Sequence, residues 1–183
     1  MTQALLDQDY LIQTLTHLVQ INSINPSLVI GAPGEKQIAA YVSDALQSFG
    51  LEVKWHEPQP GRISVVGILK GTGGGRSIML NAHLDTVGVD NMPKPFSAEI
   101  KDGKLYGRGA YDMKGSIAAC LAAVKALSEG DPLRGDVLMA AVADEEYASL
   151  GTEEIAKNYK TDAAIVTEPT ELAVCIAHKG FVW

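Results

Sequence analysis

The sequence predicts an α/β fold with a mixed, largely parallel sheet flanked by helices. Segments with apolar residues at helical spacing alternate along the chain with short apolar runs, which is the order expected when helices cover a sheet. One run, 136–143, is apolar almost throughout, as in a strand buried on both faces. With 183 residues, 46% of them hydrophobic and 20% charged, the chain has an ordinary globular composition and is long enough for one domain with its own core.

The first half of the chain is predicted to hold two helices and three strands. Helices are expected at 10–21 and 34–48, and strands at 51–56, 63–70 and 77–82. Asp7 and Asp9 are candidate caps for the first helix, and Gly50 is the expected stop of the second.

Glycines cluster at 71–75, between the second and third of these strands. Such a cluster occurs in phosphate-binding loops, which need a helix N-terminus directly after the glycines. The residues that follow, 77–80, have the composition of a strand instead. A flexible hairpin turn is therefore the favoured interpretation.

The second half begins with a hairpin signal, because Lys101-Asp102-Gly103 separates two short strand-like segments, 96–100 and 104–106. An alanine-rich helix is expected over 113–128, with Gly130 as its stop. The remaining elements are expected in the order strand, helix, strand, strand, at 136–143, 151–159, 163–167 and 173–177.

The net charge of −7 argues against nucleic acid as a partner, because phosphate binding needs a basic face. No apolar stretch approaches the roughly 18 residues of a membrane span, and the N-terminus lacks a secretory signal pattern. Cys120 and Cys175 lie in apolar runs and are interpreted as buried residues of a reducing compartment. The expectation is a cytoplasmic protein without a membrane or nucleic-acid partner.

Residues of the kinds that bind metal ions follow several of the predicted strands. They are His83, Asp85, Asp112, the run Asp144-Glu145-Glu146, and Glu168. Active sites of α/β sheets lie at the carboxyl ends of the strands. Carboxylates at such ends, with one imidazole and no nearby cysteine, indicate a hydrolytic metal centre.

Each of these residues also has a simpler interpretation when it is taken alone. His83 and Asp85 would be a surface polar pair, and Asp112 would be a helix N-cap. The acidic run would be a solvated turn, and Glu168 would be an acid that begins a turn. These interpretations would have to coincide at the ends of successive strands, so the metal centre is favoured for the set as a whole.

A count of charges favours two metal ions over one. Asp112, Glu146 and Glu168, together with a hydroxide, carry the negative charge that two divalent cations would balance. Two-metal hydrolases hold their ions about 3.5–4 Å apart, with a shared carboxylate and water. Oxygen-rich ligation suits zinc, and also cobalt or manganese. Asp85 is placed to reach back to the second ring nitrogen of His83 and fix its tautomer.

Four segments together resemble the M20 metallopeptidase family, also called the acetylornithine deacetylase and succinyl-diaminopimelate desuccinylase family. They are 83–87, 105–115, 144–146 and 168–170. The resemblance covers almost the whole chain and implies a zinc-peptidase-like catalytic domain. Gly88 departs from the family pattern, in which many members have proline at this place.

The resemblance implies a role for each residue of the set. The implied metal ligands are His83 and Glu168 for one zinc, Glu146 for the other, and Asp112 as the bridge. Asp85 would orient His83, and Glu145 would act as general base and then as general acid. The implied reaction is cleavage of an amide bond in an N-acyl amino acid by a metal-activated water.

Members of the family are longer than this chain, with an inserted lid and dimerisation domain. Residues 1–178 are therefore expected to form the N-terminal portion of the catalytic domain, and 179–183 to begin the lid. The second zinc's histidine would lie beyond this sequence, because His178 is not its equivalent by position and His17 and His56 are interpreted as structural. The expectation is a fragment with little or no activity alone, and a full-length homodimer formed through the lid.

Two other functions stay open at this point. One is a dipeptidase, aminopeptidase or carboxypeptidase on the same scaffold, acting on a peptide substrate. The other is a non-catalytic metal-binding fragment. Glu145 favours an enzyme, because a site that only binds metal has no use for a general base beside its ligand.

Overall fold

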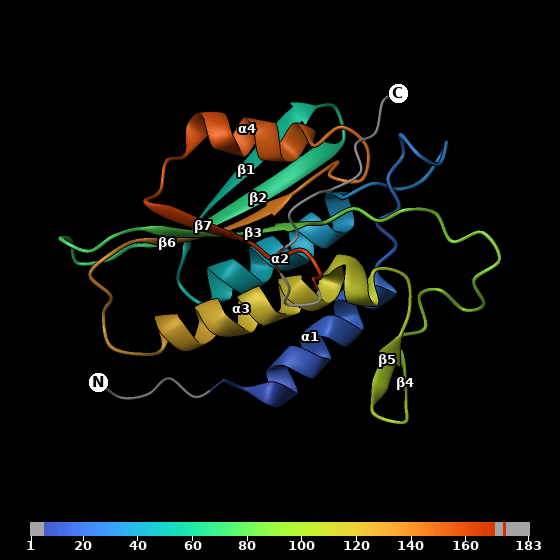
Figure 1. Ribbon diagram of the computed structural model, residues 1–183, viewed down its shortest axis with the longest axis horizontal. Helices are drawn as coiled ribbons and strands as arrows, with labels where there is room; N and C mark the ends of the chain where they lie inside the picture. Colours follow the sequence, from blue (N-terminus) through green and yellow to red (C-terminus); the bar gives the residue numbers. More distant parts are fainter. Residues whose placement is uncertain (1–5, 171–173, 175–183) are drawn as a thin grey trace.

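The computed structural model describes residues 6–170 and residue 174, and it has the predicted α/β architecture (Figure 1). The expected domain boundary after residue 178 lies outside the described residues. The same holds for the expected strand at 173–177, apart from Val174, which belongs to no strand. Cys175 is also outside this part of the chain, whereas Cys120 is a buried free thiol, as expected.

The main sheet has five strands in the order β1-β2-β6-β3-β7. They are β1 (Glu52–Gln59), β2 (Arg62–Leu69), β3 (Ile78–His83), β6 (Val137–Val142) and β7 (Ala163–Val166). Strand β3 pairs in parallel with both β6 and β7, whereas β2 pairs antiparallel with β1 and β6. All strands except β2 therefore run in the same direction, which confirms the mixed, largely parallel sheet.

Helices cover both faces of this sheet, as Figure 1 shows. On one face lie α1 (Gln8–Gln20), α2 (Lys36–Ser48) and α3 (Gly115–Ser128), and on the other lies α4 (Leu150–Asn158). The larger core fills the space between the three helices and the sheet, and a smaller cluster packs under α4 around Ile155. Strand β6 is buried along its whole length, as its apolar composition predicted.

Local signals account for several element ends. The carboxylate of Asp7 accepts a hydrogen bond from the backbone N–H of Tyr10 at 2.9 Å and so caps α1. Strands β4 (Glu99–Lys101) and β5 (Lys104–Tyr106) form the predicted hairpin. Both residues of its turn, Asp102 and Gly103, have positive φ, which matches the right-handed twist of the two strands.

The glycine-rich segment 71–75 is not the hairpin turn that its composition suggested. A hairpin joins neighbouring strands, but β6 lies between β2 and β3 in the sheet. The segment passes along residues 133–135 instead, and Thr72 N–H donates to the carbonyl of Leu133 at 2.8 Å. A Cβ on Gly71 or Gly75 would lie 2.6 or 2.5 Å from backbone atoms of Gly135. The glycines thus allow two loops to pack backbone against backbone.

None of the helices in the described part of the chain combines the length and the apolar character that crossing a membrane requires.

The close contact between these loops predicts that Gly135→Ala destabilises the fold. The added methyl group would overlap the carbonyl oxygen of Arg76, and a neighbouring backbone cannot move aside as a side-chain end can. We expect a loss of about 1–3 kcal/mol in the free energy of unfolding, measured by denaturant titration.

Gly88→Ala is the matched control, because its Cβ would meet only side-chain atoms, Val29 Cγ2 at 3.2 Å and Asp90 Oδ1 at 4.0 Å. Equal unfolding midpoints for the two variants would contradict the proposed reason for the glycines.

Candidate metal centre

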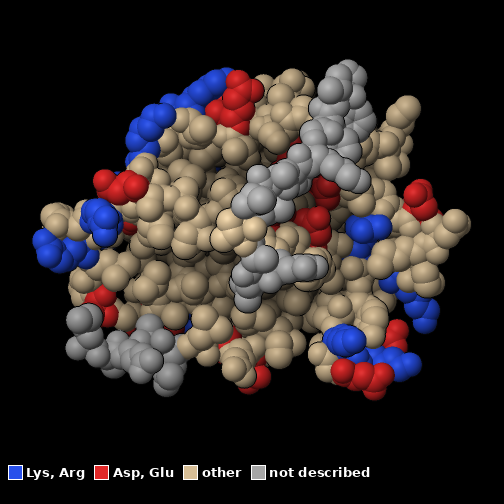
Figure 2. All heavy atoms as spheres, in the orientation of Figure 1, with Lys and Arg blue, Asp and Glu red and all other residues tan. Residues whose placement is uncertain are grey.

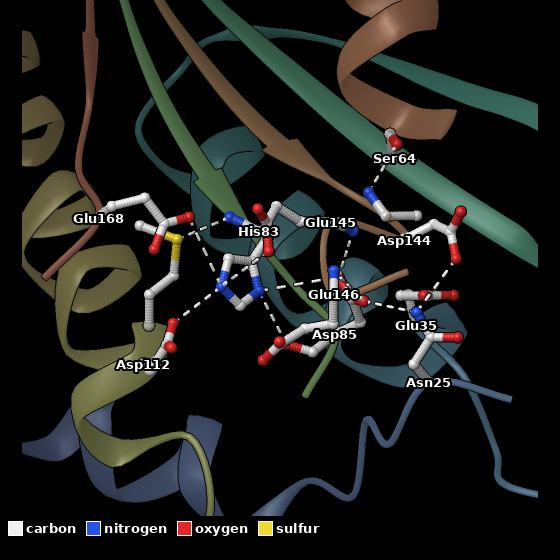
Figure 3. A network of polar contacts seen from close by, with 12 residues as sticks. Asn25, Glu35, Ser64, His83, Asp85, Asp112, Asp144, Glu145, Glu146 and Glu168 are labelled. Carbon is white, nitrogen blue, oxygen red and sulfur yellow. Dashed lines mark hydrogen bonds and ion pairs between the residues drawn. The ribbon is translucent and has the colours of Figure 1, made fainter. Parts of the chain in front are cut away.

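The site lies where three parallel strands end at one edge of the sheet (Figure 3). Strand β3 ends on His83, β6 is followed by the acidic run 144–146, and β7 is followed closely by Glu168. The central register pairs His83 with Val142, so the imidazole lies level with the start of the acidic run. The topology brings together residues that the sequence separates widely.

The ring of His83 is 1% exposed and turns one nitrogen toward a group of acids. Its Nε2 lies 3.0 Å from Asp112 Oδ1, 3.7 Å from Glu168 Oε1 and 3.9 Å from Glu145 Oε2. Its Nδ1 lies 2.8 Å from the main-chain carbonyl of Asp85, a contact in which the ring nitrogen is the donor. That contact leaves the Nε2 lone pair free to bind a metal ion.

The carboxylate of Asp85 makes a different contact from the one that the spacing suggested. Its Oδ1 is 3.7 Å from His83 Nδ1, beyond hydrogen-bond distance. It accepts hydrogen bonds instead from the backbone N–H groups of Glu145, at 3.0 Å, and Glu146, at 3.2 Å. Asp85 therefore orients the imidazole through its main chain and holds the acidic turn through its side chain.

Asp112 lies in an irregular helical turn, η1 (Ala110–Lys114), directly before α3. The helix cap is Lys114, and α3 receives no side-chain cap hydrogen bond, so Asp112 is not the N-cap. Its backbone is extended, with φ −118° and ψ 100°, and its carboxylate faces His83. Lys114 is buried, and its Nζ donates to the carbonyl of Ile21 at 2.7 Å, which ties this turn to the end of α1.

Burial and mutual repulsion both raise the pKa values of the acids in the site. The pKa of Glu146 is raised to about 7, first by burial and then by the charges of Asp112, Asp85 and Glu145, against the lowering effect of His83. Burial likewise raises the pKa of Glu145 and of Glu168, again against His83.

The pKa of His83 is also raised, but burial acts on it in the opposite direction. Burial lowers its pKa, but the hydrogen bond to Asp112 and the charges of neighbouring acids outweigh burial and raise it to about 9. The site therefore lacks positive charge. A divalent cation would supply that charge, and a set of oxygen donors with one imidazole is the kind of set that binds such an ion.

Two groups of side chains in the described part of the chain have donor atoms close enough to share an ion. One is His83, Asp112 and Glu146, and the other is His83, Glu145 and Glu168. Within each group the donor atoms lie within 4.8 Å of one another. The structure thus brings together every ligand that the sequence singled out. It also places Glu145, expected to be the base, among the possible ligands.

Three further polar residues lie beside the site, and no role was predicted for them from the sequence. They are Asn25, Glu35 and Arg62, all buried. Asn25 stands between the two helices predicted at 10–21 and 34–48, and Arg62 begins a strand that is apolar apart from Ser64. A charged residue at the start of so apolar a strand was the one available signal. Figure 3 shows Asn25 and Glu35 on the side of the acidic run that faces away from Asp112.

Acidic side chains also reach the outer surface. Figure 2 shows some of them near the middle of this face, whereas the other acids and most Lys and Arg side chains lie toward its periphery. An electronegative surface of this kind attracts cations from solution.

Comparison with known proteins gives a family for this chain. Residues 79–178 match the sequence profile of "Peptidase family M20/M25/M40". The chain is 32% identical over 170 residues to N-formyl-4-amino-5-aminomethyl-2-methylpyrimidine deformylase of Halalkalibacterium halodurans, covering 88% of this chain and 40% of that protein. It is 35% identical over 151 residues to acetylornithine deacetylase of Salmonella typhimurium, covering 79% of this chain and 38% of that protein. The chain thus spans about 40% of the length of these curated relatives.

Solved structures agree with this assignment. Human carnosine dipeptidase 1 superposes with a TM-score of 0.74 at 27% identity, covering 88% of this chain and 39% of that one. An M20 family metallo-carboxypeptidase from Sulfolobus solfataricus superposes with a TM-score of 0.73 over 85% of this chain and 36% of that one, and at 24% identity it shows the shared fold alone. With its matched segment, its relatives and its fold in accord, the chain belongs to peptidase family M20/M25/M40.

Proposed function

We propose that the protein is a metal-dependent hydrolase that cleaves the amide bond of an N-acyl amino acid. The observation that carries this proposal is the convergence of four acids on one buried imidazole at the ends of parallel strands. Such a donor set binds a divalent cation and leaves a carboxylate available for proton transfer. The deformylase and deacetylase among the curated relatives support hydrolysis of an acylated amine as the reaction class.

The proposed ligands fall into two sets that share Asp112. His83 and Glu168 would hold one ion with Asp112, because both carboxylates approach His83 Nε2, at 3.0 and 3.7 Å. Glu146 would hold a second ion with Asp112, in keeping with their place in one group of donors. We infer zinc as the metal, with cobalt or manganese as alternatives, from the oxygen-rich donor set.

A metal pair, when bound, would polarise the amide carbonyl and lower the pKa of water toward about 7. Glu145 would accept a proton from the attacking water and return it to the nitrogen of the leaving amine. Its raised pKa suits both steps, because a base whose pKa lies nearer neutrality also serves as an acid at neutral pH. Asp85 would keep Glu145 in place through the hydrogen bond to its backbone N–H.

A peptidase on the same scaffold is the second candidate. The structural likeness to human carnosine dipeptidase 1 favours it, at 27% identity over 88% of this chain. Both reactions cleave an amide bond, so the two candidates differ in what flanks that bond and not in the chemistry. A homodimer and a cytoplasmic location also remain proposals that come from the sequence.

Hydrolysis by the full-length, metal-loaded protein of a small substrate panel tests the proposed function. The panel holds acetylornithine, succinyl-diaminopimelate and simple dipeptides. We expect the acylated amino acids to be cleaved with a higher kcat/KM than the dipeptides. The reverse order would select the peptidase, and no hydrolysis with any of four metals (zinc, cobalt, manganese or magnesium) would refute both.

Glu145→Gln tests the role of the proposed base. The amide cannot accept the proton of water, so we expect kcat to fall by about 10²–10⁴-fold while metal stoichiometry stays that of the unchanged protein. Metal content is measured by elemental analysis after dialysis. Glu153→Gln on α4 is the control, because it removes the same charge from an exposed ion pair with Lys157. Loss of one metal ion in Glu145→Gln would instead make Glu145 a ligand, as the second group of donors allows.

Metal affinity should depend on pH, because protons and metal ions compete for the same atoms. His83, with a pKa of about 9 without metal, is protonated at neutral pH and must lose that proton to bind an ion. We expect the apparent affinity to rise about tenfold per pH unit between pH 7 and 9. Below about pH 7 the rise should be steeper, because Glu146 must also lose a proton.

The proton release is measured by calorimetric titration of the metal-free protein with Zn²⁺ in buffers of different ionisation enthalpy. Glu146→Gln is the matched variant. In this variant the apparent metal affinity should lose only the steeper dependence on pH that is expected below about pH 7. A pH-independent affinity over this range would contradict the assignment of His83 as a ligand.

A further inference from the structure

A second cluster of charged and polar side chains lies behind the acidic turn, away from the metal-facing atoms. It consists of Asn25, Glu35, Arg62, Asp85 and Asp144, and we call it the anchor cluster. No member is more than 5% exposed. Its members come from four separate parts of the chain, and none of them is among the proposed metal ligands. So many buried polar groups in one place need a physical reason.

The amide of Asn25 uses all of its hydrogen-bonding capacity. Its Nδ2 donates to Asp85 Oδ2 at 2.7 Å and to Asp144 Oδ1 at 3.0 Å. Its Oδ1 accepts from Arg62 Nη1 at 3.1 Å and from the backbone N–H of Ser27 at 2.8 Å. Two donors and two acceptor positions are all that the amide has. Asn25 is therefore held in one orientation, with its N–H groups toward the two aspartates.

Arg62 is the cation of the anchor cluster, and three carboxylates surround it or lie close by. Its Nη2 bonds Asp144 Oδ1 and also lies 2.7 Å from Glu35 Oε1. The cluster is not optimised for stability, because Arg62 Nε and Asp144 Oδ2 are buried without a hydrogen-bond partner. The short contact between Arg62 and Glu35 is an ion pair that lacks hydrogen-bond geometry. A buried ionic set is often no more stable than an apolar one of the same shape.

The anchor cluster is joined directly to the turn that carries Glu145 and Glu146. Strand β2 pairs with β6 as far as Ala141, and its side chains continue the contact beyond the ladder. Ser64 Oγ accepts from the N–H of Ala143 at 3.0 Å, and Arg62, two residues earlier, bonds Asp144. Asp144 has a φ of 67°, in the left-handed region, so the chain reverses direction here.

The reversal at Asp144 turns the next two backbone N–H groups toward Asp85. The carboxylate of Asp85 accepts from both of them, and Asn25 holds that carboxylate from its other side. Movement of Asn25 would therefore pass to the backbone of Glu145 and Glu146 through the hydrogen bonds of Asp85. Movement of Arg62 would pass through its bond to Asp144, the residue directly before them. Figure 3 shows this chain of contacts from Asn25 through Asp85 to the acidic run.

We propose that Arg62 and Asn25 are positioning residues that fix the 144–146 turn, and with it the proton-transferring and metal-binding side chains of the site. The role given to Glu145 and Glu146 rests on the proposed function, but the physical claim about the turn does not. Arg62 and Asn25 belong to neither group of possible metal donors. They act through Asp85 and Asp144.

The test separates positioning from folding with a charge-compensated double variant, Arg62→Met with Glu35→Gln. Above neutral pH, where Glu35 is ionised although burial raises its pKa to about 7, the double variant removes one positive and one negative charge. The net charge of the buried cluster is then unchanged while the bridge to Asp144 and Asn25 is lost. Hydrogen–deuterium exchange of the full-length, metal-free protein is followed by mass spectrometry on peptides that span 137–149.

We expect the amides of Glu145 and Glu146 to exchange about five- to tenfold faster, the change expected when their hydrogen bonds weaken. The amides of β6 should keep their protection. Arg62→Lys, which keeps the charge but not the planar fork, should show a smaller change of the same kind, and it decides the question if the double variant does not fold. Arg134→Met is the matched control, because Arg134 is an exposed arginine that bonds the Gly74 carbonyl in the loop contact before β6.

A second measurement uses activity. With the turn displaced, kcat should fall about 10- to 100-fold with little change in KM, because the substrate itself loses no contact. Unchanged exchange at Glu145 and Glu146 in both variants, or an equal rise throughout β6, would overturn the proposal. If the unchanged protein hydrolyses no amide, the proposed function fails, and the exchange result still decides whether the bonds of Arg62 to Asn25 and Asp144 hold the turn.

Discussion

The site depends on negative charge that the fold concentrates around one buried imidazole. Three parallel strands end at the same edge, and each delivers a carboxylate or the imidazole to one small volume. The acids would move apart if they were free to do so, but the sheet holds their backbones in place. Burial first, and then the neighbouring acids, raise the pKa of Glu146, and the hydrogen bond to Asp112 and the nearby acids raise that of His83 against burial. A bound cation would offset the repulsion between the acids, which links the fold to metal-dependent chemistry.

On the side of the site that faces the protein interior, hydrogen bonds hold the backbone of the acidic turn 144–146. The backbone of the acidic turn must hold one shape while its side chains repel one another. Asp85 provides the shape by accepting hydrogen bonds from two successive N–H groups, and Asn25 and Arg62 fix the aspartates from behind. The carboxylates on the two sides of the turn therefore differ in what balances their negative charge. Those on the outer side form a candidate site for a cation, and those on the inner side are balanced by Arg62 and by N–H donors.

Most elements of the fold were predictable because their signals are local. Helix α1 follows from apolar spacing and the cap at Asp7, and β6 from its unbroken apolar run. The glycine-rich segment was interpreted wrongly for the opposite reason. Its conformation depends on β6 lying between β2 and β3, and β6 is more than 60 residues away in sequence. Glycine composition shows that a backbone needs room, but it does not show what the backbone approaches.

The candidate side chains of the site were predictable from the sequence, because His83, Asp112 and the acidic run stand in short motifs whose residue types are those of metal-binding sites. The way in which they are held follows only from the tertiary structure. Asp85 contacts His83 through its carbonyl, and its carboxylate reaches a turn 60 residues further along the chain. Asn25 bonds Asp144 across a separation of 119 residues. Hydrogen bonds are directional and short, so contacts between distant segments exist only once the strands have taken their order and register.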